Sequence, residues 1–135
     1  MNMKTGSINE IYTFACTPHI FYEILMDSDK HSKLTQSNAS ISKQIGEEFS
    51  VFNGSIIGKN IELVEDKKIV QLWRDDDWVK GHYSKLSFEL NAKGNNTIVH
   101  LTQIDIPINE VDKIKAGWED YYWIELRKML KIIEQ

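Results

Sequence analysis

Six segments of the chain have the hydrophobic pattern of β-strands. The clearest covers residues 82–90, where Leu86, Phe88 and Leu90 share one face and polar residues take the other. Residues 91–96 hold one glycine and three asparagines, which predicts a hairpin turn. Because short turns separate the last five segments, we expect a meander of antiparallel neighbours. The six segments are residues 8–15, 49–52, 56–64, 68–74, 82–90 and 97–106.

Two short helices are predicted directly after the first strand. Thr17 can cap the free N–H groups of a helix start, and Pro18 suits the first helical position. Asp27 and Ser28 end that helix. We expect Ser28 to cap a second helix over residues 29–36, before a polar loop.

A long helix is predicted for the end of the chain. Pro107 ends the last strand, Asn109 is a good N-cap, and Glu110 and Asp112 suit the positive end of the helix dipole. Only this helix is long enough to cover the apolar face of the sheet. The predicted fold is α+β, a single domain over residues 1–135 in which a curved antiparallel sheet grips the helix. At 100° per residue, the apolar stripe of the helix comprises Val111, Ile114, Trp118, Tyr121, Tyr122, Met129, Ile132 and Ile133.

Composition narrows the functional classes. Hydrophobic residues make up 41% of the chain, charged residues 27%, and the formal net charge is −4 with acids and bases interspersed. Non-specific nucleic-acid binding needs a clustered basic excess, so we expect no nucleic-acid partner. The single Cys16 forms no internal disulfide. Residues 1–10 lack the apolar core of a signal peptide, and no segment approaches the ~20 apolar residues of a membrane span. We expect a cytoplasmic monomer that does not enter a membrane.

The sequence predicts no catalytic residue, metal site or cofactor. The chain has no cysteine pair, no G-x-S-x-G turn and no phosphate-binding glycine loop. Cys16 ends the first strand and is expected to be a packing residue. The histidines lack the i, i+4 spacing of a helical zinc site; they are His19, His31, His82 and His100.

Two residues of the last helix conflict with its simple two-sided pattern. Glu125 falls within the apolar stripe, where a carboxylate needs a partner or a raised pKa. It is either an acid that lines a pocket or a structural charge, which is paired with Arg74 or a histidine or lies where the helix extends beyond the sheet. Trp123 points away from the stripe. It is either an anchor for a partner protein or a residue covered by a loop or by the short helices.

The segment from Arg74 to Trp78 is an acidic loop that ends in an aromatic residue. Such a loop is either a solvated turn or a surface that meets a basic partner. The candidate partner-binding residues are Asp75, Asp76, Asp77, Trp78 and Trp123. The candidate lining residues of an internal cavity are Trp73, Trp118, Tyr122 and Glu125.

Residues 56–130 resemble the C-terminal domain of the activators of the Hsp90 ATPase, the Aha1 family. The first residues match more loosely, through Thr17-Pro18 and the following helix. The matching pieces are Asn53-Gly54 with Gly58, Glu62-Leu63-Val64, Lys68-Ile69-Val70, Trp73-Arg74, Trp78, Gly81-His82-Tyr83, Gly117-Trp118 and Tyr121-Tyr122.

The resemblance implies the helix-grip fold, also called the Bet v 1-like or START-like fold, and a non-catalytic Hsp90 co-chaperone. Such a protein promotes ATP hydrolysis by binding the closed state of Hsp90 better than the open state. Typical activators carry a second, N-terminal domain. Because 135 residues leave no room for it, we expect this chain to act as a stand-alone C-terminal-type domain. The alternative is a START-type protein that binds a hydrophobic small molecule or lipid between sheet and helix, or a cyclase-like enzyme.

Overall fold

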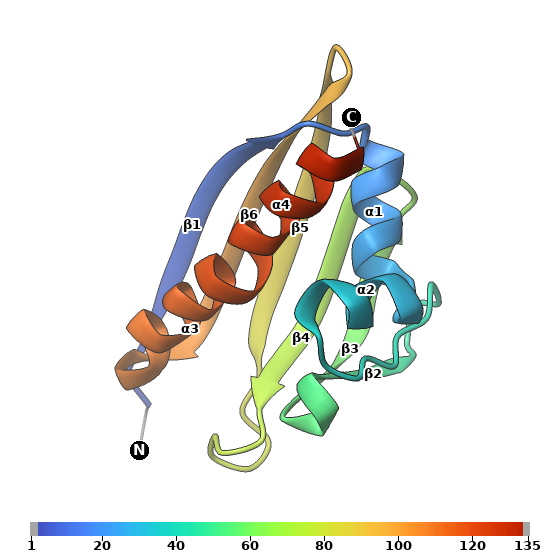
Figure 1. Ribbon diagram of the computed structural model, residues 1–135. Helices are drawn as coiled ribbons and strands as arrows, with labels where there is room; N and C mark the ends of the chain where they lie inside the picture. Colours follow the sequence, from blue (N-terminus) through green and yellow to red (C-terminus); the bar gives the residue numbers. More distant parts are fainter. Residues whose placement is uncertain (1–2, 134–135) are drawn as a thin grey trace.

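One six-stranded antiparallel sheet curls around the C-terminal helix in the computed structural model, which describes residues 3–133 and the side chains of residues 3–130 (Figure 1). The strand order is β1-β6-β5-β4-β3-β2, so the last five strands form the predicted meander and β1 closes on β6. The strands are β1 (Thr5–Phe14), β2 (Glu48–Val51), β3 (Ile56–Val64), β4 (Lys68–Asp75), β5 (Ser84–Lys93) and β6 (Asn96–Pro107).

The helices lie on the concave face of the sheet (Figure 1). The C-terminal helix crosses β1, β6 and β5, and the two short helices cover the other end of the same face. This arrangement confirms the predicted α+β helix-grip fold. The helical elements are α1 (Pro18–Met26), α2 (Ser28–Thr35), α3 (Val111–Gly117), a π-helical turn (Trp118–Trp123) and α4 (Ile124–Ile133), with 3-10 turns at Phe52–Gly54 and Ile108–Glu110.

The inner face of the sheet follows the two-residue period of the sequence. Leu86, Phe88 and Leu90 of β5 are buried, as predicted, and Ile8 and Phe14 of β1 are buried in the same core. The predicted turn over residues 91–96 is tighter than expected, because β5 and β6 stay paired as far as Lys93 and Asn96.

Two of the three predicted helix caps differ in the structure. Thr17 accepts a hydrogen bond from the Ile20 N–H, as expected. Asp27, not Ser28, caps α2, because the Ser28 hydroxyl is held by the N–H and the carbonyl of Ile41 in the following loop. The predicted N-cap at Asn109 is also wrong. A 3-10 turn precedes α3 there, and no side chain caps the helix.

The π-helical turn changes which side of the C-terminal helix is buried. The Ile124 N–H donates to the carbonyl of Glu119, five residues earlier, so one extra residue enters the turn. Each extra residue rotates the remainder of the helix by about 100°. The predicted stripe positions Ile114, Trp118 and Tyr122 are buried, and Val111 and Met129 are partly buried against the core. Beyond the turn, the buried positions are Leu126 and Leu130, each one residue later than the expected 125 and 129. The side chains of Ile132 and Ile133 lie outside the described residues.

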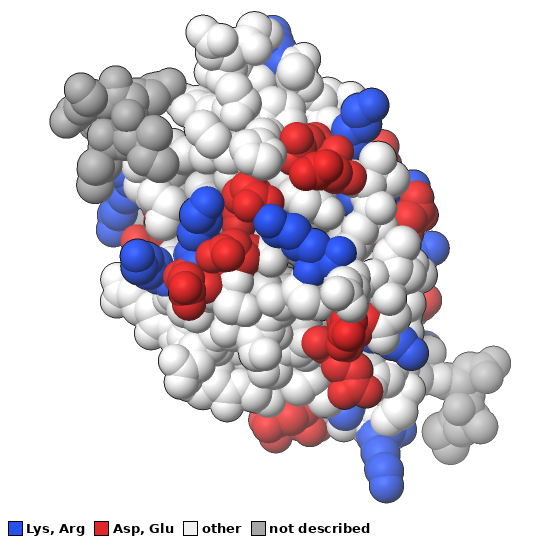
Figure 2. All heavy atoms as spheres, turned by 90° about the vertical axis from the view of Figure 1, so that its right-hand side faces the viewer, with Lys and Arg blue, Asp and Glu red and all other residues white. Residues whose placement is uncertain are grey.

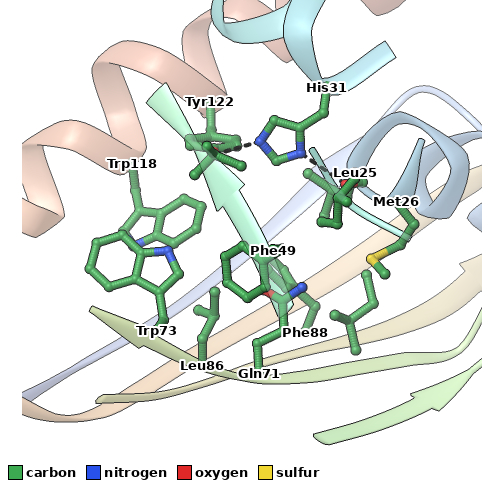
Figure 3. A pocket seen from close by; sticks show the side chains of 13 residues that line it. Leu25, Met26, His31, Phe49, Gln71, Trp73, Leu86, Phe88, Trp118 and Tyr122 are labelled. Atoms are coloured by element: carbon green, nitrogen blue, oxygen red, sulfur yellow. Dashed lines mark hydrogen bonds between the residues drawn. The ribbon is translucent and has the colours of Figure 1, made fainter. Parts of the chain in front are cut away.

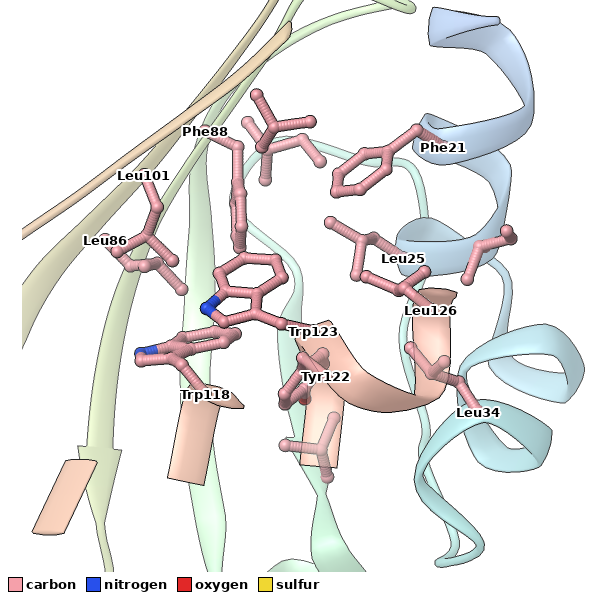
Figure 4. Packing of buried hydrophobic residues seen from close by; sticks show 14 of the residues in the cluster. Phe21, Leu25, Leu34, Leu86, Phe88, Leu101, Trp118, Tyr122, Trp123 and Leu126 are labelled. Atoms are coloured by element: carbon pink, nitrogen blue, oxygen red, sulfur yellow. The ribbon is translucent and has the colours of Figure 1, made fainter. Parts of the chain in front are cut away.

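Three aromatic side chains fix the π-helical turn to three other elements. The Trp118 Nε1–H donates to Gln103 Oε1 of β6 at 2.8 Å, and the Trp123 Nε1–H donates to Glu10 Oε1 of β1 at 3.1 Å. The Tyr122 hydroxyl lies 2.7 Å from His31 Nε2 of α2. The rings of Trp118 and Trp123 stack at 5.7 Å in the middle of the core (Figure 4). Tertiary contacts therefore hold the turn in place.

Gly58 marks the tightest backbone approach in the sheet, and its replacement should be costly. A Cβ at this position would overlap the Leu72 carbonyl oxygen and the Phe49 ring. We expect Gly58→Ala to lower the free energy of unfolding by about 1–3 kcal/mol, measured by urea denaturation. Gly117→Ala is the matched control, because its nearest atom, on Tyr121, would be 4.0 Å away. It should be neutral or stabilising, by up to about 1 kcal/mol. Equal stability of the two variants would contradict this explanation.

Candidate functional site

The acidic loop after β4 is clamped rather than free. Arg74 Nη2–H donates to the carbonyl of Trp78 at 2.6 Å, and Arg74 Nε–H donates to the carbonyl of His82 at 3.2 Å. Trp78 therefore folds back, packs on Trp73 at 5.7 Å between ring centres, and is 6% exposed. Trp78 was a candidate partner-binding residue; this burial contradicts that prediction, and Asp76 and Asp77 form the exposed part of the loop.

The prediction that Trp123 is a surface anchor is wrong. Its side chain is fully buried between Trp118, Tyr12 and Phe14, because the π-helical turn rotates it inward. The same rotation carries Glu125 toward the surface. Its carboxylate lies 3.6 Å from Lys128 Nζ and does not line the internal cavity. Tyr121 was predicted to lie in the buried stripe of the helix. It is 54% exposed because of the same rotation, so this prediction is wrong.

An internal cavity of ≈ 20 Å³ lies between the sheet and the C-terminal helix (Figure 3). Three of the four predicted lining residues, Trp73, Trp118 and Tyr122, form part of its wall. This volume holds about one water molecule. Drug-sized ligands occupy pockets of about 300–1,000 Å³, so large aromatic and aliphatic side chains fill the space that such a ligand would need.

His31 and Tyr122 form a buried polar pair on the wall of this cavity (Figure 3). His31 Nδ1 lies 2.8 Å from the carbonyl oxygen of Leu25, which can only accept, so Nδ1 carries the hydrogen. Nε2 of the neutral ring then accepts from the Tyr122 hydroxyl at 2.7 Å. Burial lowers the pKa of His31, against a smaller opposite effect of the Leu25 hydrogen bond, and burial raises the pKa of Tyr122.

A larger groove lies outside the aromatic wall. Its volume is ≈ 440 Å³, and it runs between the 3-10 turn Phe52–Gly54, the end of β4 and the helical segment 113–122. Trp73, Trp118 and Tyr122 line both the groove and the cavity, so these three rings separate the two spaces. Tyr121 is the most exposed aromatic side chain of the groove, and Phe52 packs on it at 5.4 Å between ring centres.

Carboxylates border this groove. Asp75 and Asp120 line it, and the carboxylates of Asp76 and Asp77 come within 4.8 Å of that of Asp75. Lys113 also lines the groove, but its Nζ lies 3.8 Å from both Asp75 and Glu110. Of the described residues, none forms an ion pair with Asp76, Asp77 or Asp120. The acidic loop predicted from sequence therefore becomes one edge of an apolar groove.

Sequence reasoning missed the partners that complete the groove. Nothing in the sequence indicates that Phe52 packs on Tyr121, 69 positions further along the chain. The only local signal was Asn53-Gly54, a pair typical of turns. His31 was also missed as a polar contact of the last helix, because its partner Tyr122 is distant in sequence.

Other surface features carry less specific chemistry. The His19 imidazole and the carboxylates of Glu65 and Asp66 come within 4.8 Å of one another, which spacing along the chain did not reveal. Acidic and basic side chains alternate on the face shown in Figure 2 without forming a patch of one sign. No helix within residues 3–133 combines the length and apolar character needed to cross a membrane.

The sheet that grips a C-terminal helix defines the helix-grip class, and comparison with known proteins specifies the family. Residues 15–131 match the family described as activator of Hsp90 ATPase homolog 1-like protein. An activator of 90 kDa heat shock protein ATPase homolog from Dictyostelium discoideum is 36% identical over 117 residues, which are 86% of this chain and 30% of that protein. The human activator homolog 1 is 26% identical over 123 residues, which are 91% of this chain and 36% of that protein.

A solved structure has the same architecture. The crystal structure of an HSP90 activator from Plasmodium falciparum has a TM-score of 0.89 and 26% identity, covering 96% of this chain and 97% of that one. The chain therefore belongs to the activator of Hsp90 ATPase homolog 1-like family, which confirms the resemblance noted from sequence. It spans about a third of the length of the curated relatives named above.

Two aromatic residues of the π-helical turn that lie two positions apart should differ sharply in their contribution to stability. Trp123 is 0% exposed and Tyr121 is 54% exposed. We expect Trp123→Ala to cost about 3–5 kcal/mol of unfolding free energy, and Tyr121→Ala less than about 1 kcal/mol. Chemical denaturation followed by tryptophan fluorescence and circular dichroism measures both. A small loss for Trp123→Ala would show that the turn does not bury this ring.

The buried His31 should make the fold less stable in mild acid. Its pKa is lowered from the ordinary value of 6.5, so below that pH the unfolded chain takes up a proton that the folded chain does not. The contribution of His31 to the free energy of unfolding is complete above pH 6.5. It declines as the pH falls toward the lowered pKa of the folded chain, by up to about 1.4 kcal/mol per pH unit. Urea denaturation between pH 7.5 and 5 measures the slope. His31→Gln should remove this part of the slope, and an unchanged slope would contradict the assignment.

Proposed function

We propose that this chain is a non-catalytic co-chaperone domain that binds Hsp90 and promotes its ATPase cycle. The observation that carries the proposal is the family match over residues 15–131. Relatives in the same family are named as activators of the Hsp90 ATPase, in organisms as distant as Dictyostelium and human. Hsp90 is therefore the partner that the comparisons favour.

The interior of the domain supports protein binding over the enclosure of a ligand. A START-type carrier needs a cavity of hundreds of cubic ångströms, and the space here is ≈ 20 Å³. The outer groove, of ≈ 440 Å³, is open to a protein surface. As a regulator, the domain need only bind the closed state of Hsp90 better than the open state. A difference of about 1.4 kcal/mol shifts that equilibrium tenfold.

Binding and stimulation of Hsp90 test this proposal separately. The purified chain should be captured by immobilised Hsp90, more strongly with a non-hydrolysable ATP analogue than without nucleotide. It should also raise the Hsp90 ATPase rate, after subtraction of the activity that remains with an inhibitor of the Hsp90 ATP site. Ile11→Ala, on the outer face of β1 and 63% exposed, is the control variant and should behave as the wild type.

Absence of capture in both nucleotide states would refute the proposal. Capture without stimulation would retain Hsp90 binding and refute activation by this chain alone. A panel of fatty acids and other lipid-like compounds in a thermal-shift assay tests the ligand alternative. We expect no rise in Tm, because binding to the folded state would require an enlarged cavity.

A further inference from the structure

The outer groove is preformed by a backbone conformation that is unusual for a bulky side chain. Phe52 has φ 52° and Asn53 has φ 58°, both in the left-handed region that favours glycine. Such conformations cost about 1–3 kcal/mol each and persist only where surrounding contacts determine them. Here the Asn38 N–H donates to Asn53 Oδ1 at 3.0 Å, and the Asn53 N–H donates to the Asn38 carbonyl at 3.1 Å.

This strained turn fixes one wall of the groove. Phe52 is held against Tyr121 and Tyr122 of the π-helical turn, at 5.4 and 6.0 Å between ring centres. The π-helical turn forms the opposite wall of the groove, and this wall is also fixed. Because both walls are already ordered, a partner that enters the groove would lose little free energy to ordering the protein.

The helix presents small residues at the centre of the groove. Ala116 and Gly117 line it, and the nearest atom to a Cβ added at Gly117 would be 4.0 Å away, on the Tyr121 side chain. A partner side chain can therefore reach the helix backbone between Ile114 and Tyr121. The aromatic rings of Trp73 and Trp118 close the bottom of the groove, where they separate it from the internal cavity.

The charges around this apolar site have one predominant sign. Asp75 and Asp120 line it, and the carboxylates of Asp76 and Asp77 come within 4.8 Å of that of Asp75. Lys113, the single cation among the lining residues, is already shared between Asp75 and Glu110. Phosphate groups of nucleic acids or lipids would be repelled here. A Lys or Arg would instead find exposed carboxylates beside the apolar floor.

We propose that this groove docks a protein segment in which an aromatic or large aliphatic side chain is flanked by Lys or Arg. The apolar side chain lies between Phe52 and Tyr121, and the flanking cations meet the Asp75–Asp77 loop on one side and Asp120 on the other. The inference that the segment belongs to Hsp90 rests on the proposed function, whereas the chemistry of recognition rests on the groove alone.

A synthetic peptide tests the groove without Hsp90. The probe is an acetylated and amidated hexapeptide of sequence Arg-Lys-Trp-Leu-Lys-Arg, titrated into ¹⁵N-labelled protein. Saturable amide shifts are expected at Phe52, Gly117 and Tyr121. A control peptide with Glu at all four basic positions should bind at least about tenfold more weakly. Absence of saturable shifts at the groove up to millimolar peptide, or equal binding of the acidic peptide, would overturn the proposal.

Two groove variants should weaken peptide binding, and a third should strengthen it. Tyr121→Ala removes the exposed aromatic wall and Asp120→Lys reverses an edge charge, so each should weaken peptide binding about tenfold. Lys113→Gln frees the Asp75 carboxylate from its cation and should tighten binding a few-fold. Ile11→Ala and Glu47→Lys are the controls, since both positions are exposed and lie outside the groove. Circular dichroism and thermal denaturation establish that each variant is folded.

The same variants distinguish the groove from the proposed function. If wild-type protein binds Hsp90 and Tyr121→Ala and Asp120→Lys bind it about tenfold more weakly, both inferences are supported. If all of them bind Hsp90 equally, the groove is not the docking site and Hsp90 binding stands. If the wild type does not bind Hsp90, the proposed function fails, and the peptide titration alone decides whether the groove recognises basic-flanked apolar segments.

Discussion

The structure depends on how the π-helical turn of the C-terminal helix is attached to its surroundings. Trp118, Tyr122 and Trp123 each place a polar atom on a different element, namely Gln103 of β6, His31 of α2 and Glu10 of β1. A buried indole N–H or hydroxyl without a partner would cost about 1–3 kcal/mol, so all three contacts favour a single rotation of the helix. That rotation decides which residues are buried along the rest of α4.

Aromatic residues also separate the internal cavity from the outer groove. In a helix-grip fold, the space between sheet and helix can hold a ligand only if the side chains there are small. Here Trp73, Trp118 and Tyr122 fill it to ≈ 20 Å³ and at the same time form the floor of the outer groove. The side chains that fill the space for an internal ligand thus also support the outer surface. This arrangement agrees with the proposal that the domain acts by contacting another protein.

The function that we propose for this chain breaks no bond, so its structural requirements differ from those of an enzyme. It needs a rigid surface whose affinity differs between two states of its partner. The Arg74 clamp on the Asp75–Trp78 loop and the hydrogen-bonded Phe52–Asn53 turn both supply rigidity at the edges of the groove. In the docking that we propose, the exposed carboxylates beside apolar rings would supply selectivity of charge and shape.

Local patterns in the sequence determined the strands, the meander and the start of α1, because alternation and capping involve neighbours in the chain. Leu86, Phe88 and Leu90 are buried as their period requires, and Thr17 caps as expected. The orientation of Trp123 and Glu125 could not be predicted, because a regular helix has 3.6 residues per turn and the π-helical turn inserts one more residue. Contacts with β1, β6 and α2 hold that insertion, and the groove likewise depends on Phe52 meeting Tyr121 across the fold. Only the tertiary structure decides such features, since their energy comes from residues that are distant along the chain.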